Sequence, residues 1–155
     1  HPEYTEKLCQ EFANHFKDMG IETVIGPATG GIILSQVTAR LLGVRSIFTE
    51  RENGKMTLRR GFKVAPGEKV LIVEDIVTTG GSIKEVVDVV NEAKGDIVGI
   101  GLFVDRSGGK ADFGVPKEKV YPLLHLTVPT YKPEECPLCK EGVPITERGS
   151  HHLKK

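Results

Sequence analysis

Apolar and polar residues follow one another along the chain in blocks that predict alternating helices and strands. Residues 4–19 carry apolar side chains at helical spacing, and Gly20 follows as a natural helix stop. A short apolar run, TVIGP, then leads into a glycine-rich turn and a second helical stretch, IILSQVTARLLG, which ends at Gly43. Residues 46–50 have the pattern of another strand. This part of the chain is therefore expected to form a β-α-β unit.

Three longer apolar runs predict further core strands. They are VLIVED at residues 70–75, IVGIGLFVDRS at 97–107 and VYPLLHLTVP at 120–129. A helical stretch with one valine-rich face begins at Ser82 and closes at Gly95. Because these strands are apolar throughout, the pattern predicts an α/β fold, a mainly parallel central sheet flanked by helices on both faces. Such sheets bind ligands at the carboxyl ends of their strands.

Two polar segments interrupt this alternation. Residues 51–61, RENGKMTLRRG, carry an Asn-Gly turn signal at Asn53 and predict an exposed, mobile loop or a hairpin. Residues 130–155 are polar and contain proline, so we expect an irregular C-terminal tail. No repeat or linker divides the chain, and residues 1–155 are expected to form a single domain. Because the first residue is His1 rather than methionine, an N-terminal segment is expected to be missing.

Composition narrows the choice of partner and compartment. Lys plus Arg and Asp plus Glu number 21 each, so no overall positive charge draws the chain to nucleic acid or to an anionic membrane. No apolar run approaches the roughly 20 residues that cross a bilayer. Three cysteines are too few for the disulfide framework of a small secreted domain. We therefore expect a cytoplasmic protein that binds neither nucleic acid nor membrane.

The segment EDIVTTGGS, residues 74–82, follows a core strand directly. Its glycines let backbone N–H groups approach an anion, its hydroxyls can donate to phosphate oxygens, and the next helix adds partial positive charge. It lacks the lysine of a P-loop, which favours a cup for a single phosphate. Glu74 and Asp75 can accept hydrogen bonds from a sugar diol, so the whole segment suits ribose 5-phosphate. The alternative is a capped helix beside two solvated acids.

This segment resembles the signature of the type I phosphoribosyltransferases, an apolar strand followed by two acids, three variable or threonine-rich positions and TGGS or TGGT. Within that family it is similar to the orotate phosphoribosyltransferases, and the resemblance extends from the GPATGG loop to the CPLC tail. It implies the type I fold with a small hood and a flexible catalytic loop. It also implies transfer of ribose 5-phosphate from phosphoribosyl pyrophosphate to orotate, giving orotidine 5′-monophosphate in pyrimidine (UMP) biosynthesis.

The resemblance assigns substrate contacts residue by residue. The residues expected to bind phosphoribosyl pyrophosphate are Arg51, Lys55, Glu74, Asp75, Ile76, Val77, Thr78, Thr79, Gly80, Gly81 and Ser82. The residues expected to form a pyrophosphate loop, whose glycines also suit an anion nest, are Ala28, Thr29, Gly30 and Gly31. The expected catalytic residues are Lys55, Asp75 and Glu74. The alternatives are a plain tight turn at residues 26–31 and a solvated basic loop around Arg51 and Lys55.

Arg106, in VDRSGG, follows another core strand. In the orotate enzymes an arginine here binds the carboxylate of the base, and Thr78 is the matching hydroxyl beside it. A guanidinium can hold such a planar anion with two hydrogen bonds. The alternative is a surface arginine paired with Asp105 or Asp112.

The resemblance also implies a cofactor and a partner. Magnesium is expected to be held mainly by substrate and water, with no protein metal ligand. A homodimer with shared active sites is expected, in which Arg51 or Lys55 acts on the partner's substrate. Two rival functions use the same fold. The first is a purine phosphoribosyltransferase, which Arg106 and the TTGGS cup make the less favoured interpretation. The second is a nucleotide-sensing regulator that binds nucleic acid, which the balanced charge does not favour.

Cys136 and Cys139 have the CxxC spacing found in zinc sites, but a full site needs four ligands. The other candidate ligands are Cys9, His151 and His152. A structural pair of thiols and half of an intersubunit metal site both remain open. His125 lies within an apolar run and is expected to be a satisfied core histidine.

Overall fold

The computed structural model describes residues 1–129, 131–132 and 134–144. Six strands form one sheet in the order β3-β2-β1-β4-β5-β6. The strands are β1 (Thr23–Pro27), β2 (Arg45–Glu52), β3 (Lys55–Leu58), β4 (Lys69–Val77), β5 (Asp96–Asp105) and β6 (Val120–His125). Neighbouring strands run parallel except β2 and β3, which pair antiparallel. The mainly parallel α/β sheet predicted from the apolar runs is confirmed.

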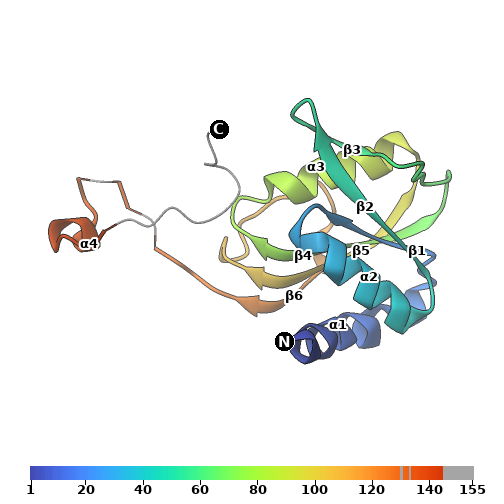
Figure 1. Cartoon of the computed structure of the whole chain (residues 1–155), viewed down its shortest axis with the longest axis horizontal. Coiled ribbons are helices and arrows are strands. Elements are labelled where there is room, and N and C mark those ends of the chain that lie inside the picture. The colour runs from blue at the N-terminus through green and yellow to red at the C-terminus, as the bar shows by residue number, and fades with distance from the viewer. Residues whose placement is uncertain (130, 133, 145–155) are drawn as a thin grey trace.

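Helices cover both faces of this sheet (Figure 1). The covering helices are α1 (Pro2–Phe16), α2 (Gly30–Leu42) and α3 (Gly81–Glu92). The short α4 (Pro137–Lys140) lies apart from the sheet, and 3-10 turns occupy Lys17–Met19 and Lys117–Lys119. The valine-rich face of α3 packs on one side of the sheet, where Ile72 and Ile100 are buried. α1 and α2 pack on the other side, around Leu71 and Val73. In the described part of the chain, no helix is long and apolar enough to cross a membrane.

Two glycines of β5 let α1 lie directly on the sheet. A Cβ atom on Gly99 would lie 2.3 Å from the ring of Phe16, and one on Gly101 would lie 3.0 Å from the ring of Phe12. Both rings are fully or almost fully buried. Because a close-packed interior leaves no room for an added methyl group, the aromatic stripe of α1 requires these two glycines opposite it.

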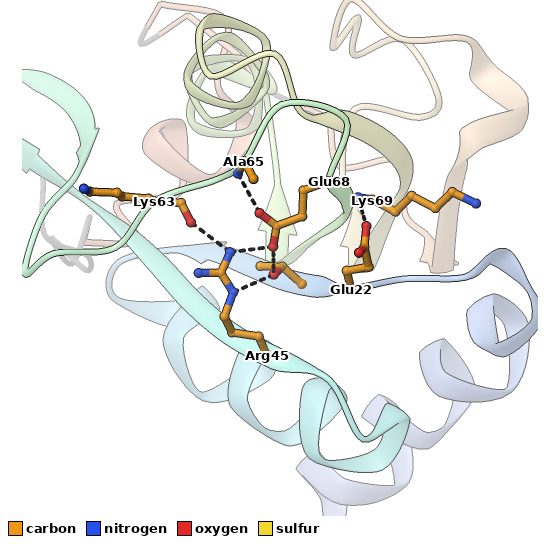
Figure 2. A network of polar contacts seen from close by, with 7 residues as sticks. Glu22, Arg45, Lys63, Ala65, Glu68 and Lys69 are labelled. Carbon is orange, nitrogen blue, oxygen red and sulfur yellow. Dashed lines mark hydrogen bonds and ion pairs between the residues drawn. The ribbon is translucent and has the colours of Figure 1, made fainter.

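Polar side chains join the amino ends of three neighbouring elements, at the sheet edge opposite the glycine-rich loops (Figure 2). Glu68 accepts hydrogen bonds from the Thr23 hydroxyl, the Arg45 guanidinium and the Ala65 N–H. Burial alone would raise the pKa of Glu68, but these hydrogen bonds and the charge of Arg45 outweigh it and lower the pKa. Arg45 also donates to the carbonyl oxygen of Lys63 at 2.8 Å. The network holds this edge of the sheet together.

The basic segment takes one of its two predicted forms, whereas the tail and the last strand differ from the expectation. The basic segment is a β2–β3 hairpin, whose turn residues Asn53 and Gly54 have φ angles of 51° and 82°. Positive φ at both positions is what the type I′ turn of a two-residue hairpin requires. The tail, expected to be irregular, contains α4, because Pro137 suits a first helical position and the Cys136 side chain accepts the Cys139 N–H. β6 ends at His125, before the apolar run does.

Candidate active site

Three loops meet at the carboxyl ends of β1, β4 and β5. Gly30 lies so close to the Asp75 carboxylate that an added Cβ atom would be 2.3 Å from it, and the Arg106 N–H donates to the Val77 carbonyl at 2.8 Å. β1 and β4 are neighbours in the sheet although α2, β2 and β3 separate them in the sequence. The glycine-rich and charged loops therefore converge at the switch point where parallel sheets bind ligands.

Residues 78–82 form a cup at the start of α3. Gly80 has a φ of +85°, and a Cβ atom there would lie 2.9 Å from the ring of Phe113, so glycine is required. The cup borders a cavity of about 210 Å³. The cavity is lined by residues 76–83 together with Arg51, Glu74 and Glu85. Since N–H groups in the first turn of a helix lack partners within it, this end of α3 is suited to a phosphate group.

Glu74 and Asp75 point to opposite sides of β4, as successive strand residues do. Glu74 lines the cavity and is 7% exposed. Its burial, supplemented by the neighbouring Asp75 carboxylate, raises the pKa of Glu74 to about 8. Asp75 instead lies against the start of α2, where a Cβ atom on Gly30 would be 2.3 Å from its carboxylate oxygen. The two acids therefore reach the site from opposite faces of β4, while their carboxylates stay close enough for Asp75 to raise the pKa of Glu74.

The loop between β1 and α2 folds back closely on itself. Its glycines leave room for this close approach of the backbone, and they also let an anion reach the backbone N–H groups. A Cβ atom on Gly26 would lie 2.2 Å from the carbonyl oxygen of Gly31. The peptide bond between Ala28 and Thr29 is cis, and Ala28, Thr29 and Gly30 are exposed. An exposed backbone at this edge, with Asp75 beside it, can receive a ligand.

The two hairpin cations lie in different surroundings. The Arg51 guanidinium lines the cavity and donates two hydrogen bonds of 2.7 Å to the Glu85 carboxylate of α3. Lys55, on β3, is exposed and borders a separate surface hollow between the hairpin and α3. Within this chain the fold brings Arg51 to the cup but leaves Lys55 outside the cavity.

Asp105, at the end of β5, organises the loop that carries Arg106. Its buried carboxylate accepts hydrogen bonds from the Ser107 hydroxyl and N–H and from the Gly109 N–H, and it pairs with His125 at 3.2 Å. Burial alone would raise the pKa of Asp105, but these hydrogen bonds and His125 lower it. The expectation of a core position for His125 is wrong, since its side chain is 61% exposed at the end of β6.

Arg106 is exposed beside the strand that leads into the cup. Asp105 and Asp112, the alternative ion-pair partners named for Arg106, make other contacts. Asp105 accepts the Gly109 N–H of its own loop, and Asp112 accepts the Gly114 N–H. Within the described residues, no ion pair forms with the Arg106 guanidinium. Its side chain is thus available to an anionic ligand.

Sequence reasoning missed two functional neighbours. Nothing in the local pattern pointed to Glu85 as the partner of Arg51, because the pair joins a hairpin to a helix 34 positions away. Asp105 could have been found, since an aspartate followed two positions later by serine is a common turn signal. Of the other candidate zinc ligands, His151 and His152 lie outside the described residues, and Cys9 of α1 is buried against α2.

Comparison with known proteins agrees with this geometry. Residues 5–116 match the model of the phosphoribosyl transferase domain, and the chain belongs to the phosphoribosyltransferase family. The orotate phosphoribosyltransferase of Desulforamulus reducens is 58% identical over 153 residues, which cover 99% of this chain and 78% of that protein. The orotate phosphoribosyltransferase of Thermotoga maritima is 56% identical, with 99% and 80% covered. These relatives confirm the resemblance to the orotate members of the family.

Solved structures show the same fold at lower sequence identity. Adenine phosphoribosyltransferase from Rhodothermus marinus superimposes with a TM-score of 0.65 at 23% identity and covers 81% of each chain. The enzyme from Giardia lamblia gives a TM-score of 0.66 at 18% identity, with 83% of this chain and 82% of that one covered. At such identities the likeness concerns the fold alone, and it confirms the type I phosphoribosyltransferase architecture.

Proposed function

We propose that this protein transfers ribose 5-phosphate from phosphoribosyl pyrophosphate to orotate in the cytoplasm, giving orotidine 5′-monophosphate and pyrophosphate in de novo pyrimidine (UMP) biosynthesis. The observation that carries the proposal is the hydrogen bond from the Arg106 N–H to the Val77 carbonyl, which joins an exposed arginine to the strand that ends in the phosphate cup. A purine base has no carboxylate for that guanidinium to hold. The names of the relatives support the same substrate.

The cup and the two acids would hold the phosphorylated sugar. Thr78, Thr79 and Ser82 would donate hydroxyl hydrogen bonds to the 5′-phosphate, beside the backbone N–H groups of the glycines. Glu74, which faces the cavity, would accept hydrogen bonds from the ribose hydroxyls. Asp75 would reach the sugar from the side of the pyrophosphate loop.

The reaction requires charge to be balanced at both ends of the breaking bond. Departure of pyrophosphate leaves positive charge on the anomeric carbon, and the carboxylate of Asp75 would stabilise it, together with that of Glu74 when Glu74 is ionised. Arg51, Lys55 and the backbone of residues 28–31 would take the negative charge of the pyrophosphate. Arg106 and Thr78 would hold orotate in line for attack, so that no covalent enzyme intermediate is needed.

The oxygen chemistry of the site suits magnesium carried by the substrate. Asp75 is a half-buried carboxylate beside the pyrophosphate loop, a donor of the kind that Mg²⁺ prefers. Among the described residues, no group of three or more His, Cys, Asp or Glu side chains is placed to hold a metal ion. In the proposed reaction, Mg²⁺ would be held mainly by substrate oxygens and water, and it would neutralise charge on the leaving pyrophosphate.

A homodimer with shared active sites would give Lys55 a role. Lys55 lies outside the cavity of its own chain, at the exposed side of the hairpin. In the proposed dimer, the hairpin covers the partner's reactants and excludes water that would compete for the activated sugar. Mixing Lys55→Ala with Asp75→Asn protein, each expected to have strongly reduced activity, tests this. Restored activity supports shared sites, and a mixture that stays inactive while the subunits exchange contradicts them.

One assay tests the proposed reaction. The protein is incubated with Mg²⁺ and phosphoribosyl pyrophosphate together with orotate, adenine or hypoxanthine, and release of pyrophosphate is followed. We expect release with orotate only. Release with adenine or hypoxanthine but none with orotate would assign the chain to the purine enzymes. No release with any base, combined with ligand-dependent binding to nucleic acid, would favour a regulator.

A further inference from the structure

Cys136 and Cys139 bring two thiols together at the start of α4. The Cys139 N–H donates to the Cys136 sulfur at 3.4 Å. Pro137 fills the first helical position, and three residues make about one helical turn, so both sulfurs lie on the same side of the helix. Both are free thiols that are only partly buried.

The two thiols are chemically unequal. The hydrogen bond from the Cys139 N–H, followed by that from its thiol, lowers the pKa of Cys136. The hydrogen bond with Cys136 raises the pKa of Cys139. A thiol of lowered pKa supplies the attacking thiolate, and its neighbour of higher pKa can remain protonated until it is needed.

The position of α4 leaves this pair accessible. Figure 1 shows α4 apart from the sheet and from the helices that cover it. Pro137, Leu138 and Lys140, its other residues, are exposed. The third cysteine, Cys9, is fully buried in the core, and burial raises its pKa. It therefore serves as an unreactive internal reference.

We propose that Cys136 and Cys139 form a redox-active dithiol that small-molecule disulfides of the glutathione type oxidise to an intramolecular disulfide. The Cys136 thiolate attacks one sulfur of the small disulfide, whose S–S bond breaks and releases a thiolate that takes a proton from water. The Cys139 thiol then loses its proton and attacks the Cys136 sulfur, and the second small thiolate leaves. The dithiol loses two electrons and two protons, and the small disulfide becomes two thiols. The site is separate from the phosphate cup and does not depend on the proposed reaction.

The test exposes the reduced protein to oxidised glutathione, alkylates the remaining thiols under denaturing conditions and locates each modification by mass spectrometry. In the wild type we expect a disulfide between Cys136 and Cys139, with Cys9 alkylated. Cys139→Ser should stop at a glutathione adduct on Cys136. Cys136→Ser should react more slowly than Cys139→Ser, because the backbone N–H hydrogen bond that favours the thiolate is made to Cys136. Cys9→Ser should behave like the wild type.

Three outcomes would overturn the proposal. The first is stable glutathione adducts on both tail cysteines of the wild type with no internal disulfide. The second is equal reaction rates for Cys136→Ser and Cys139→Ser. The third is tight binding of zinc alone, one ion per two chains, that protects both thiols from glutathione, which would make the pair half of an intersubunit metal site.

Discussion

Arg51 and Glu85 form an ion pair with two hydrogen bonds of 2.7 Å that ties the hairpin to α3 at the rim of the phosphate cup. Both side chains are more than one-third exposed. The pair therefore holds the guanidinium beside the site, yet a pair of this exposure is weak enough to be broken by a ligand.

Glu85→Gln should improve binding of phosphoribosyl pyrophosphate. An exposed ion pair is worth about 0.2–1 kcal/mol, so its loss should lower the KM for this substrate by a factor of about 1.4 to 5. Steady-state kinetics at saturating orotate measure the effect. Glu92→Gln on the same helix is the control, because Glu92 borders the hollow away from the cup. A higher KM in Glu85→Gln would mean that Glu85 holds Arg51 in its working position.

Lys55→Ala should mainly lower turnover. If Lys55 meets the departing pyrophosphate, losing it should reduce kcat on the order of 100-fold with little change in the KM for orotate. Lys63→Ala offers a matched control, since this exposed lysine lies toward the opposite edge of the sheet and only its carbonyl oxygen bonds to Arg45. Turnover that is the same in both variants would leave the hairpin lysine without a catalytic role.

Arg106→Ala should weaken binding of orotate. Hydrogen bonds to a charged group contribute about 1.5–3 kcal/mol, so the KM for orotate should rise roughly 10- to 150-fold while the KM for phosphoribosyl pyrophosphate stays nearly unchanged. Asp105→Asn should show a smaller rise, because Asp105 only orders the loop that carries Arg106. Equal losses for both substrates in Arg106→Ala would point to a general disturbance of the site.

Glu74 should make the stability of the ligand-free protein depend on pH. Its pKa is about 8 in the folded protein and 4.5 ordinarily, so the folded state favours the protonated acid. The resulting stability is fully present below about pH 4.5 and is lost as the pH rises through about 8, with a total on the order of a few kcal/mol. Urea unfolding from pH 5 to 9 should show this decline in the wild type and in Glu92→Gln, but not in Glu74→Gln. A Glu74→Gln profile that matches the wild type would assign the decline to another group.

Much of the architecture followed from local patterns. Continuous apolar runs indicated parallel, doubly covered strands, and the aromatic spacing of Phe12 and Phe16 indicated the first helix. The segment at residues 74–82 carries its own glycines, hydroxyls and helix start, so its phosphate chemistry is local and was open to prediction. The strand order could not be predicted in this way, and neither could the role of the glycines that face Phe12 and Phe16, because both depend on residues far apart in the chain.

The sequence by itself determined the class of this protein, through a strand, two acids and a cup that are contiguous in the chain. Only the tertiary structure decided which side chains face the cavity beside that cup and which face away from it. Glu74 turns into the cavity and Asp75 toward Gly30 because of strand alternation and the packing of α2. Arg51 pairs with Glu85 because the hairpin lies over α3. Such pairings depend on long-range register and packing, which local residue patterns do not encode.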